Sequence, residues 1–205
     1  QQTELGIGNQ LVLDDERLLA NVRQVQAANQ LVQSDTLLGR HFSIEMETGT
    51  GKTYVYLRTI FELNKEYGFT KFIIVLPSVP IREGVLASID LMKEHFTAIY
   101  NQPFSRVVYD SKALGQVRQF ATSNAIQIMI MNIQSFQKDV KDDSEIASLT
   151  AEQLKKLNVI NRETDQLSGR KPIEFVQATR PIVIVDEPQN MEAEASRRAI
   201  ERLHP

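Results

Sequence analysis

The chain has 205 residues, of which 42% are hydrophobic and 24% charged, and its formal net charge is −3. This length suits one sizeable globular domain, and the charge argues against a strongly basic nucleic-acid binder, although it allows a local basic groove. The absence of cysteine excludes disulfides, thiol catalysis and cysteine-rich zinc sites. No apolar run approaches about 18 residues and no signal-peptide pattern opens the chain, so we expect a cytoplasmic protein without a membrane span.

Residues 1–40 are predicted to form an amino-terminal arm and a helix that lead into the main domain. The first ten residues are polar and contain two glycines. Apolar residues then recur at spacings of four and three, and Asp14 or Asp15 can cap the helix that this pattern predicts. An alternating apolar run at residues 42–46 indicates a strand.

A glycine-rich loop follows, with the sequence Glu-Met-Glu-Thr-Gly-Thr-Gly-Lys-Thr at residues 45–53. Its two glycines permit the tight, partly left-handed backbone that directs N–H groups at a polyphosphate, and the next helix adds its positive end. Lys52 can reach the β- and γ-phosphates, and the Thr53 hydroxyl is placed for a bridging Mg²⁺. The full pattern has a small residue where Met46 stands, but its functional core is intact. An ordinary glycine turn would not require a Lys-Thr pair here, so we predict a nucleotide site at Thr48, Gly49, Thr50, Gly51, Lys52 and Thr53.

Helix and strand patterns alternate along the rest of the chain. A continuous apolar run at residues 72–76 is typical of a central parallel strand that is covered on both faces. The other predicted elements are a helix ending near residue 68, a helix over 85–96, a strand at 106–109, a helix at 112–121, a strand at 126–131, a strand at 181–185 and a helix at 191–203. This alternation predicts an α/β fold with a mostly parallel central sheet, helices on both faces, and ligands bound beyond the carboxyl ends of the strands.

Residues 137–180 differ in character because they are rich in charge and carry only weak helical signals. Thr150 and Gln153 fit a capping box at the start of one short helix. We interpret this segment as a charged surface insertion. A solvated face is the ordinary role of such a segment, and docking of a partner is the alternative.

A second chemical motif, Asp-Glu-Pro-Gln, ends the predicted strand at residues 181–185. Asp186 at the tip of the strand can hold Mg²⁺, directly or through a water. Glu187 can accept a proton from the water that attacks the γ-phosphate. Many strands end in acids, so this motif gains its weight from the phosphate loop at residues 45–53.

Together these blocks resemble the first RecA-like motor domain of superfamily-two helicases, and more closely the Res subunit of type III restriction–modification enzymes. Residues 45–53 resemble motif I of that family, and residues 75–85 resemble motif Ia. Residues 128–136 occupy the place of motif Ib, and residues 185–189 are similar to motif II. Residues 23–26 resemble the glutamine motif that reads adenine.

The resemblance implies a RecA-like P-loop NTPase over residues 41–205 that uses ATP and Mg²⁺ to move along duplex DNA. It assigns catalytic roles to Lys52, Asp186, Glu187 and Gln189, metal binding to Thr53 and Asp186, and an adenine contact to Gln26. The strand-binding surface of such a motor contacts phosphates and not base edges. The residues carried over to that surface are Pro77, Ser78, Arg82, Asn132 and Ser135.

Members of this family continue beyond the motifs found here. The resemblance implies a second RecA-like domain with an arginine finger, a nuclease domain, and a methyltransferase (Mod) subunit as partner. We therefore expect this chain to bind Mg²⁺–nucleotide and to hydrolyse it slowly by itself, since an arginine finger contributes about three to five orders of magnitude in rate. The alternatives are the RecA-like domain of another DNA or RNA helicase, or a nucleotide-responsive partner-binding module.

Overall fold

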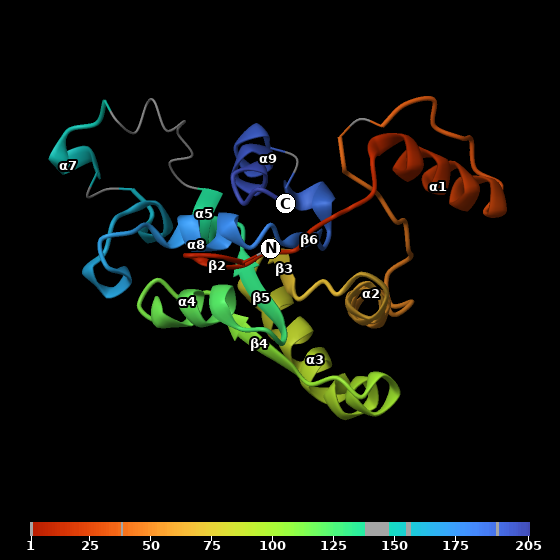
Figure 1. The fold of residues 1–205 in the computed structure, drawn as a ribbon, viewed down its shortest axis with the longest axis horizontal. Helices are drawn as coiled ribbons and strands as arrows, with labels where there is room; N and C mark the ends of the chain where they lie inside the picture. Colours follow the sequence, from red (N-terminus) through yellow and green to blue (C-terminus); the bar gives the residue numbers. More distant parts are fainter. Residues whose placement is uncertain (1, 38, 138–147, 155–156, 192) are drawn as a thin grey trace. The chain divides into compact units, whose positions relative to one another are not determined.

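The computed structural model (Figure 1) describes residues 2–37, 39–137, 148–154, 157–191 and 193–205. It divides the chain into two units. The sheet unit comprises the residues up to Gln10 and those from Thr53 onward, and the loop unit comprises Leu11–Lys52. Each unit is described by itself. In the described ranges, no helix has both the length and the apolar character that crossing a membrane requires.

The sheet unit contains a four-stranded parallel sheet in the order β4-β5-β3-β6. The strands are β3 (Lys71–Leu76), β4 (Phe104–Val108), β5 (Ile126–Asn132) and β6 (Ile182–Val185). Every residue of β3 and β5 is buried. Strands that are covered on both faces consist largely of consecutive apolar residues. For this reason β3 and β5 could be predicted from the sequence.

Successive side chains of a strand point to opposite sides, so the apolar strands present side chains on both faces of the sheet. Helices cover both of these faces. On one face, α2 (Lys52–Tyr67) and α3 (Val79–Tyr100) contribute buried residues that cluster with Phe72, Ile74 and Leu76 of β3. On the other, α4 (Gly115–Thr122), α8 (Pro172–Ala178) and α9 (Glu194–Glu201) cluster with Ile73 and Val75. The predicted α/β architecture is confirmed.

The charged segment at 137–180 is partly outside the described residues, which omit 138–147, 155 and 156. Its described part forms α7 (Ala151–Leu154), η1 (Val159–Asn161), η2 (Asp165–Leu167) and α8. The predicted capping box is present, since the Thr150 N–H donates to Gln153 Oε1 at 2.9 Å and the Gln153 N–H donates back to Thr150 Oγ1 at 3.4 Å. The expectation of a surface segment is wrong for Ile160, Leu167 and Val176, which are buried in the core and supply apolar area there.

The loop unit contains α1 (Asp15–Ala28), which begins as predicted at an Asp14 cap that accepts the Arg17 N–H at 2.8 Å. No residue of α1 is buried. The strand predicted at 42–46 is not formed, and Phe42 and Ile44 are 56% and 74% exposed. A strand needs a neighbour for its backbone hydrogen bonds, and no described strand pairs with this segment.

Short elements complete the sheet unit. The amino-terminal residues form a small antiparallel hairpin of β1 (Gln2–Thr3) and β2 (Gly6–Ile7). α5 (Gln134–Gln137) follows β5, and η3 (Pro188–Met191) follows β6. Both of these elements therefore begin at the carboxyl ends of sheet strands, where the predicted chemical residues lie.

Candidate functional site

The carboxyl ends of three adjacent strands bring predicted site residues to one edge of the sheet. The ladder places Leu76 of β3 opposite Asn132 of β5, and Val75 opposite Val185 of β6. It extends one step further, because the Asp186 N–H donates to the Val75 carbonyl at 3.1 Å. Asp186 follows β6, Pro77 follows β3 and Asn132 ends β5, at neighbouring strand ends that we call the carboxyl edge.

Glu187 has an unusual backbone at this edge. Its φ is +54°, in the left-handed region that costs a residue with a Cβ about 1–2 kcal/mol. The Asn190 N–H donates to the Glu187 carbonyl at 3.0 Å, and the Asn190 side-chain amide donates to Glu187 Oε2 at 3.1 Å. The turn therefore fixes both the main chain and the carboxylate of the predicted base. Gln189 is an exposed residue of the same turn.

The predicted metal residues Thr53 and Asp186 share a neighbour, Tyr56 of α2. Burial raises the pKa of Tyr56 to about 12; the nearby Thr53 side chain opposes this rise, and the negative charge of Asp186 adds to it. The hydroxyl of Tyr56 is buried. Thr53 and Asp186 therefore both lie near Tyr56, and a hydroxyl and a carboxylate are oxygen donors of the kind that Mg²⁺ takes.

No group of three or more His, Asp or Glu among the described residues is arranged to hold a metal ion. Such a cage is not what Mg²⁺ requires beside a nucleotide, because this ion usually takes one or two protein ligands, substrate phosphates and several waters. The residues present therefore fit a hydrated Mg²⁺ that is shared with phosphates.

The phosphate loop has the predicted backbone. Gly49 and Gly51 adopt φ of +80° and +91°. A Cβ at either position would meet nothing within 4 Å, so the backbone conformation, and not lack of space, requires glycine there. The Thr50 hydroxyl donates to the Glu47 carbonyl at 2.6 Å and closes the loop, while Lys52 is the first residue of α2.

Gln26, the predicted adenine contact, is engaged within the loop unit. Its amide donates to Ser34 Oγ at 2.9 Å and accepts the Ser34 N–H at 2.8 Å. Arg23 donates to the carbonyls of Ser34 and Asp35, both at 2.8 Å. These two side chains fix the turn after α1, and the adenine contact stays a prediction.

The residues predicted to contact DNA lie along the carboxyl edge. Ser78 precedes α3 and its hydroxyl makes no capping bond to that helix. Ser135 is half-buried in α5, and Asn132 is only 8% exposed, with a buried Oδ1 that has no hydrogen-bond partner in the described part of the chain. Arg82 is paired with Glu83 at 2.8 Å, so its charge is partly neutralised.

Two contacts that join these segments were missed by sequence reasoning. The Gln134 side chain donates to the Pro77 carbonyl at 2.6 Å and so ties α5 to the end of β3. After β6, the Asn190 side-chain amide donates to the Glu187 carboxylate within a single turn. The available signal was a polar amide two residues beyond the end of β5 and another five residues beyond the end of β6, a pattern too common in turns to be specific.

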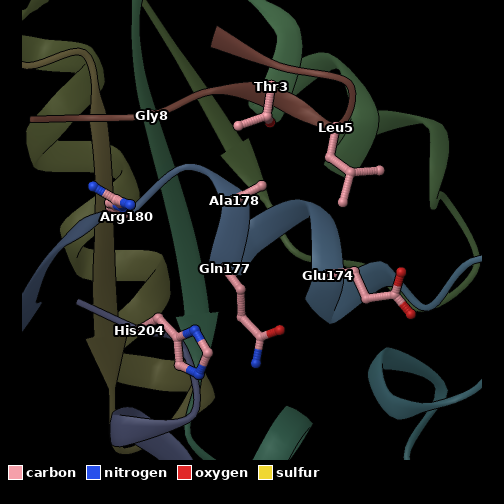
Figure 2. Close-up of a pocket in the computed structure, with 8 residues that line it drawn as sticks. All are labelled: Thr3, Leu5, Gly8, Glu174, Gln177, Ala178, Arg180 and His204. Atoms are coloured by element: carbon pink, nitrogen blue, oxygen red, sulfur yellow. The ribbon is translucent and has the colours of Figure 1, made fainter. Parts of the chain in front are cut away.

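A cavity in the sheet unit lies elsewhere (Figure 2). It has a volume of about 400 Å³ and is lined by Leu5 and Gly8 of the amino-terminal segment, by Gln177 of α8, and by Arg180 and His204. Arg180 precedes β6, so this cavity is at the amino ends of the strands. It contains none of the predicted site residues.

Comparison with known proteins supplies the family. The family model described as "Type III restriction enzyme, res subunit" matches residues 18–205. The chain is 30% identical over 190 residues to the EcoP15I Res subunit of Escherichia coli, and 30% identical over 187 residues to the StyLTI Res subunit of Salmonella typhimurium. It is 28% identical over 193 residues to the EcoPI Res subunit of Escherichia phage P1.

These alignments cover 87%, 87% and 89% of this chain but only 19%, 18% and 19% of the relatives. The chain thus spans about a fifth of the length of the relatives it matches. The alignments and the family model agree on one assignment, and the parallel sheet with helices on both faces agrees with the RecA-like fold of that domain. The chain belongs to the family of type III restriction enzyme Res subunits.

Proposed function

We propose that this chain is the ATP-binding motor domain of a type III restriction enzyme, and that hydrolysis of Mg²⁺–ATP drives movement along duplex DNA. Cleavage would come from a nuclease domain outside this chain, and the Mod methyltransferase would be its partner, in the cytoplasm. The observation that carries the proposal is the combination of a left-handed Gly-Thr-Gly-Lys-Thr loop with an Asp186-Glu187 pair at the carboxyl edge of a parallel sheet.

Each residue has a role in this proposal. The amides of residues 48–51 and the Lys52 ammonium would hold the phosphates, with Gln26 at the base. Glu187 would orient the attacking water and accept its proton, assisted by Gln189. Thr53 and Asp186 would hold Mg²⁺, which when bound would neutralise charge on the phosphates.

The DNA path would follow the carboxyl ends of β3 and β5. Pro77, Ser78, Arg82, Asn132 and Ser135 come from two adjacent strand ends, joined by the hydrogen bond from Gln134 to Pro77. Hydroxyls, amides and one guanidinium suit contact with sugar-phosphate backbone, which positions a strand without reading its sequence. The contribution of the largely buried Asn132 would be to shape this edge.

The test is steady-state ATP hydrolysis by the full-length protein that contains this chain, with and without duplex DNA. We expect DNA to stimulate turnover, and the 205-residue chain alone to turn over slowly under both conditions. Stimulation by RNA in place of DNA would move the assignment to another helicase class. No response to either would contradict the translocase proposal while leaving nucleotide binding to be measured separately.

A further inference from the structure

The turn after β6 is anchored at both of its ends. At its start, the Asp186 N–H is held by the Val75 carbonyl at 3.1 Å, as the last rung of the sheet. At its end, Met191 is 4% exposed and packs in the core. Pro188 opens the intervening η3 with a fixed φ. The path of the backbone past Glu187 is therefore set by the fold.

Asn190 makes two different contacts with Glu187 inside this turn. Its main-chain N–H donates to the Glu187 carbonyl at 3.0 Å, a bond that any residue except proline can make. Its side-chain amide donates to Glu187 Oε2 at 3.1 Å, a bond that needs a side-chain donor. The second contact restrains the rotamer of a carboxylate whose backbone already sits in the left-handed region.

We propose that Asn190 is a positioning residue that holds the Glu187 carboxylate in its working orientation. This inference rests on the proposed function, in which Glu187 accepts the proton of the attacking water. A neutral amide suits this role because it donates a hydrogen bond to the carboxylate and adds no positive charge that would pair with it. Left-handed backbone at a residue with a Cβ costs free energy and tends to occur where function needs a fixed geometry.

The test compares Asn190→Ala, Asn190→Asp and Asn190→Ser in the full-length protein with duplex DNA. We expect kcat to fall roughly 10- to 100-fold in Asn190→Ala, with KM for ATP and nucleotide affinity unchanged. Asn190→Asp should be slower still, because a carboxylate cannot donate and repels Glu187. Asn190→Ser, which retains a donor, should recover part of the loss.

If Asn190 only stabilises the turn, the kcat values of Asn190→Ala and Asn190→Asp should follow the opposite order. Aspartate has the size of asparagine and is favoured in turns, so Asn190→Asp would then turn over faster than Asn190→Ala. The matched control is Asn124→Asp, which makes the same change at an exposed residue before β5, at the amino end of that strand. It should leave kcat unchanged.

The results of these measurements distinguish a failure of this inference from a failure of the proposed function. If Glu187→Gln stops turnover while Asn190→Ala and Asn190→Asp match the wild type, the inference is overturned and the function stands. If Glu187→Gln turns over normally, both are overturned. Melting temperatures are measured for all variants. If the melting temperature of Asn190→Asp is well below that of the wild type, the comparison of Asn190→Ser with Asn190→Ala decides. Equal kcat values in these two variants would overturn the inference.

Discussion

The two edges of the parallel sheet differ in what their polar side chains contact. At the amino edge, Asn9 donates to the Lys71 carbonyl at 2.8 Å and accepts the Thr70 N–H at 2.9 Å. The fully buried Lys71 ammonium donates to the carbonyls of Phe120 and Ser123 at 2.6 and 2.5 Å. These groups are satisfied by the chain itself and join β3 to the amino-terminal segment and to the end of α4. In contrast, Oε1 of Gln127, opposite Lys71 in β5, is buried without a hydrogen-bond partner among the described residues.

The carboxyl edge also contains buried polar atoms without a partner. Asn132 Oδ1 and the hydroxyl of Tyr109, which follows β4, are buried without a hydrogen-bond partner in the described part of the molecule. Glu187 carries a left-handed backbone. Arg180, which precedes β6 at the amino edge, also has a left-handed backbone, so these features alone do not distinguish the two edges. The carboxyl edge is distinguished by the Asp186-Glu187 pair.

From this comparison, and with the proposed chemistry at the Asp186-Glu187 pair, we expect the two ends of the sheet to separate stability from activity. Changes at the amino edge should alter the free energy of unfolding and leave chemistry intact. Changes at the carboxyl edge should alter chemistry and leave stability nearly intact. Five predictions can break or sharpen this division.

The largest expected effect is at Glu187. Glu187→Gln keeps the size and the hydrogen-bonding capacity of the side chain but removes the base, so DNA-stimulated turnover should fall by about 10²- to 10⁴-fold. Nucleotide affinity, measured by equilibrium titration, should stay at the wild-type value. An equal loss of affinity would show that Glu187 supports binding, and its proposed role would be wrong.

The second effect concerns packing at the amino edge. A Cβ added at Gly8 would lie 2.7 Å from the Ala178 carbonyl oxygen, which is backbone and cannot move aside, so Gly8→Ala should cost about 1–3 kcal/mol of unfolding free energy. Gly84→Ala is the matched control, because it lies in α3 with nothing within 4 Å of the new Cβ. It should stabilise by about 0.5–1 kcal/mol in urea unfolding. The same sign for both variants would contradict the close packing at Gly8.

The third effect is at Lys71. Lys71→Met keeps the apolar stem but leaves two buried carbonyls without their donor, and it should cost about 1–3 kcal/mol at pH 7. Nucleotide affinity should not change. An affinity loss without a stability loss would break the division between the two edges.

The same residue makes a pH prediction. Burial lowers the pKa of Lys71 from 10.5 to about 8, so between these pH values the unfolded chain binds more protons than the folded one. The unfolding free energy of the wild type, measured relative to Lys71→Met, should therefore rise as pH increases from about 8 to about 10.5. A flat or falling difference would mean that the buried ammonium is stabilised by its two carbonyls as strongly as it is by water.

The smallest effect tests the strained backbone. Glu187→Gly and Glu187→Ala both remove the carboxylate, but only glycine adopts a positive φ without a steric cost. The glycine variant should be more stable than the alanine variant by about 1 kcal/mol, as read from chemical denaturation of the two. Equal stabilities would indicate that the turn relaxes in the absence of the side chain.

Much of the sheet unit could be predicted from the sequence. The strands at 71–76 and 126–132 show continuous apolar runs because both of their faces are covered. The glycine positions of the phosphate loop and the Asp14 helix cap also follow from local chemistry, because each depends on the residue itself and its immediate neighbours.

Other features depend on partners that a local pattern does not contain. The alternating residues 42–46 have the pattern of a strand, but alternation does not supply the neighbouring strand that would accept their backbone hydrogen bonds. Burial of Ile160 and Leu167 was hidden by the charged residues around them. The contact from Asn190 to Glu187 becomes visible only with the positive φ that brings the two side chains together.

The central claim is that the chain binds Mg²⁺–nucleotide, and titration of the 205-residue chain with a fluorescent ATP analogue tests it most directly. We expect binding that requires Mg²⁺, that Lys52→Ala weakens by about 10- to 100-fold through loss of charge-assisted hydrogen bonds, and that Glu187→Gln leaves unchanged. Equal affinity of the wild type and Lys52→Ala, or binding that ignores Mg²⁺, would contradict the assignment of the loop and of the carboxyl edge.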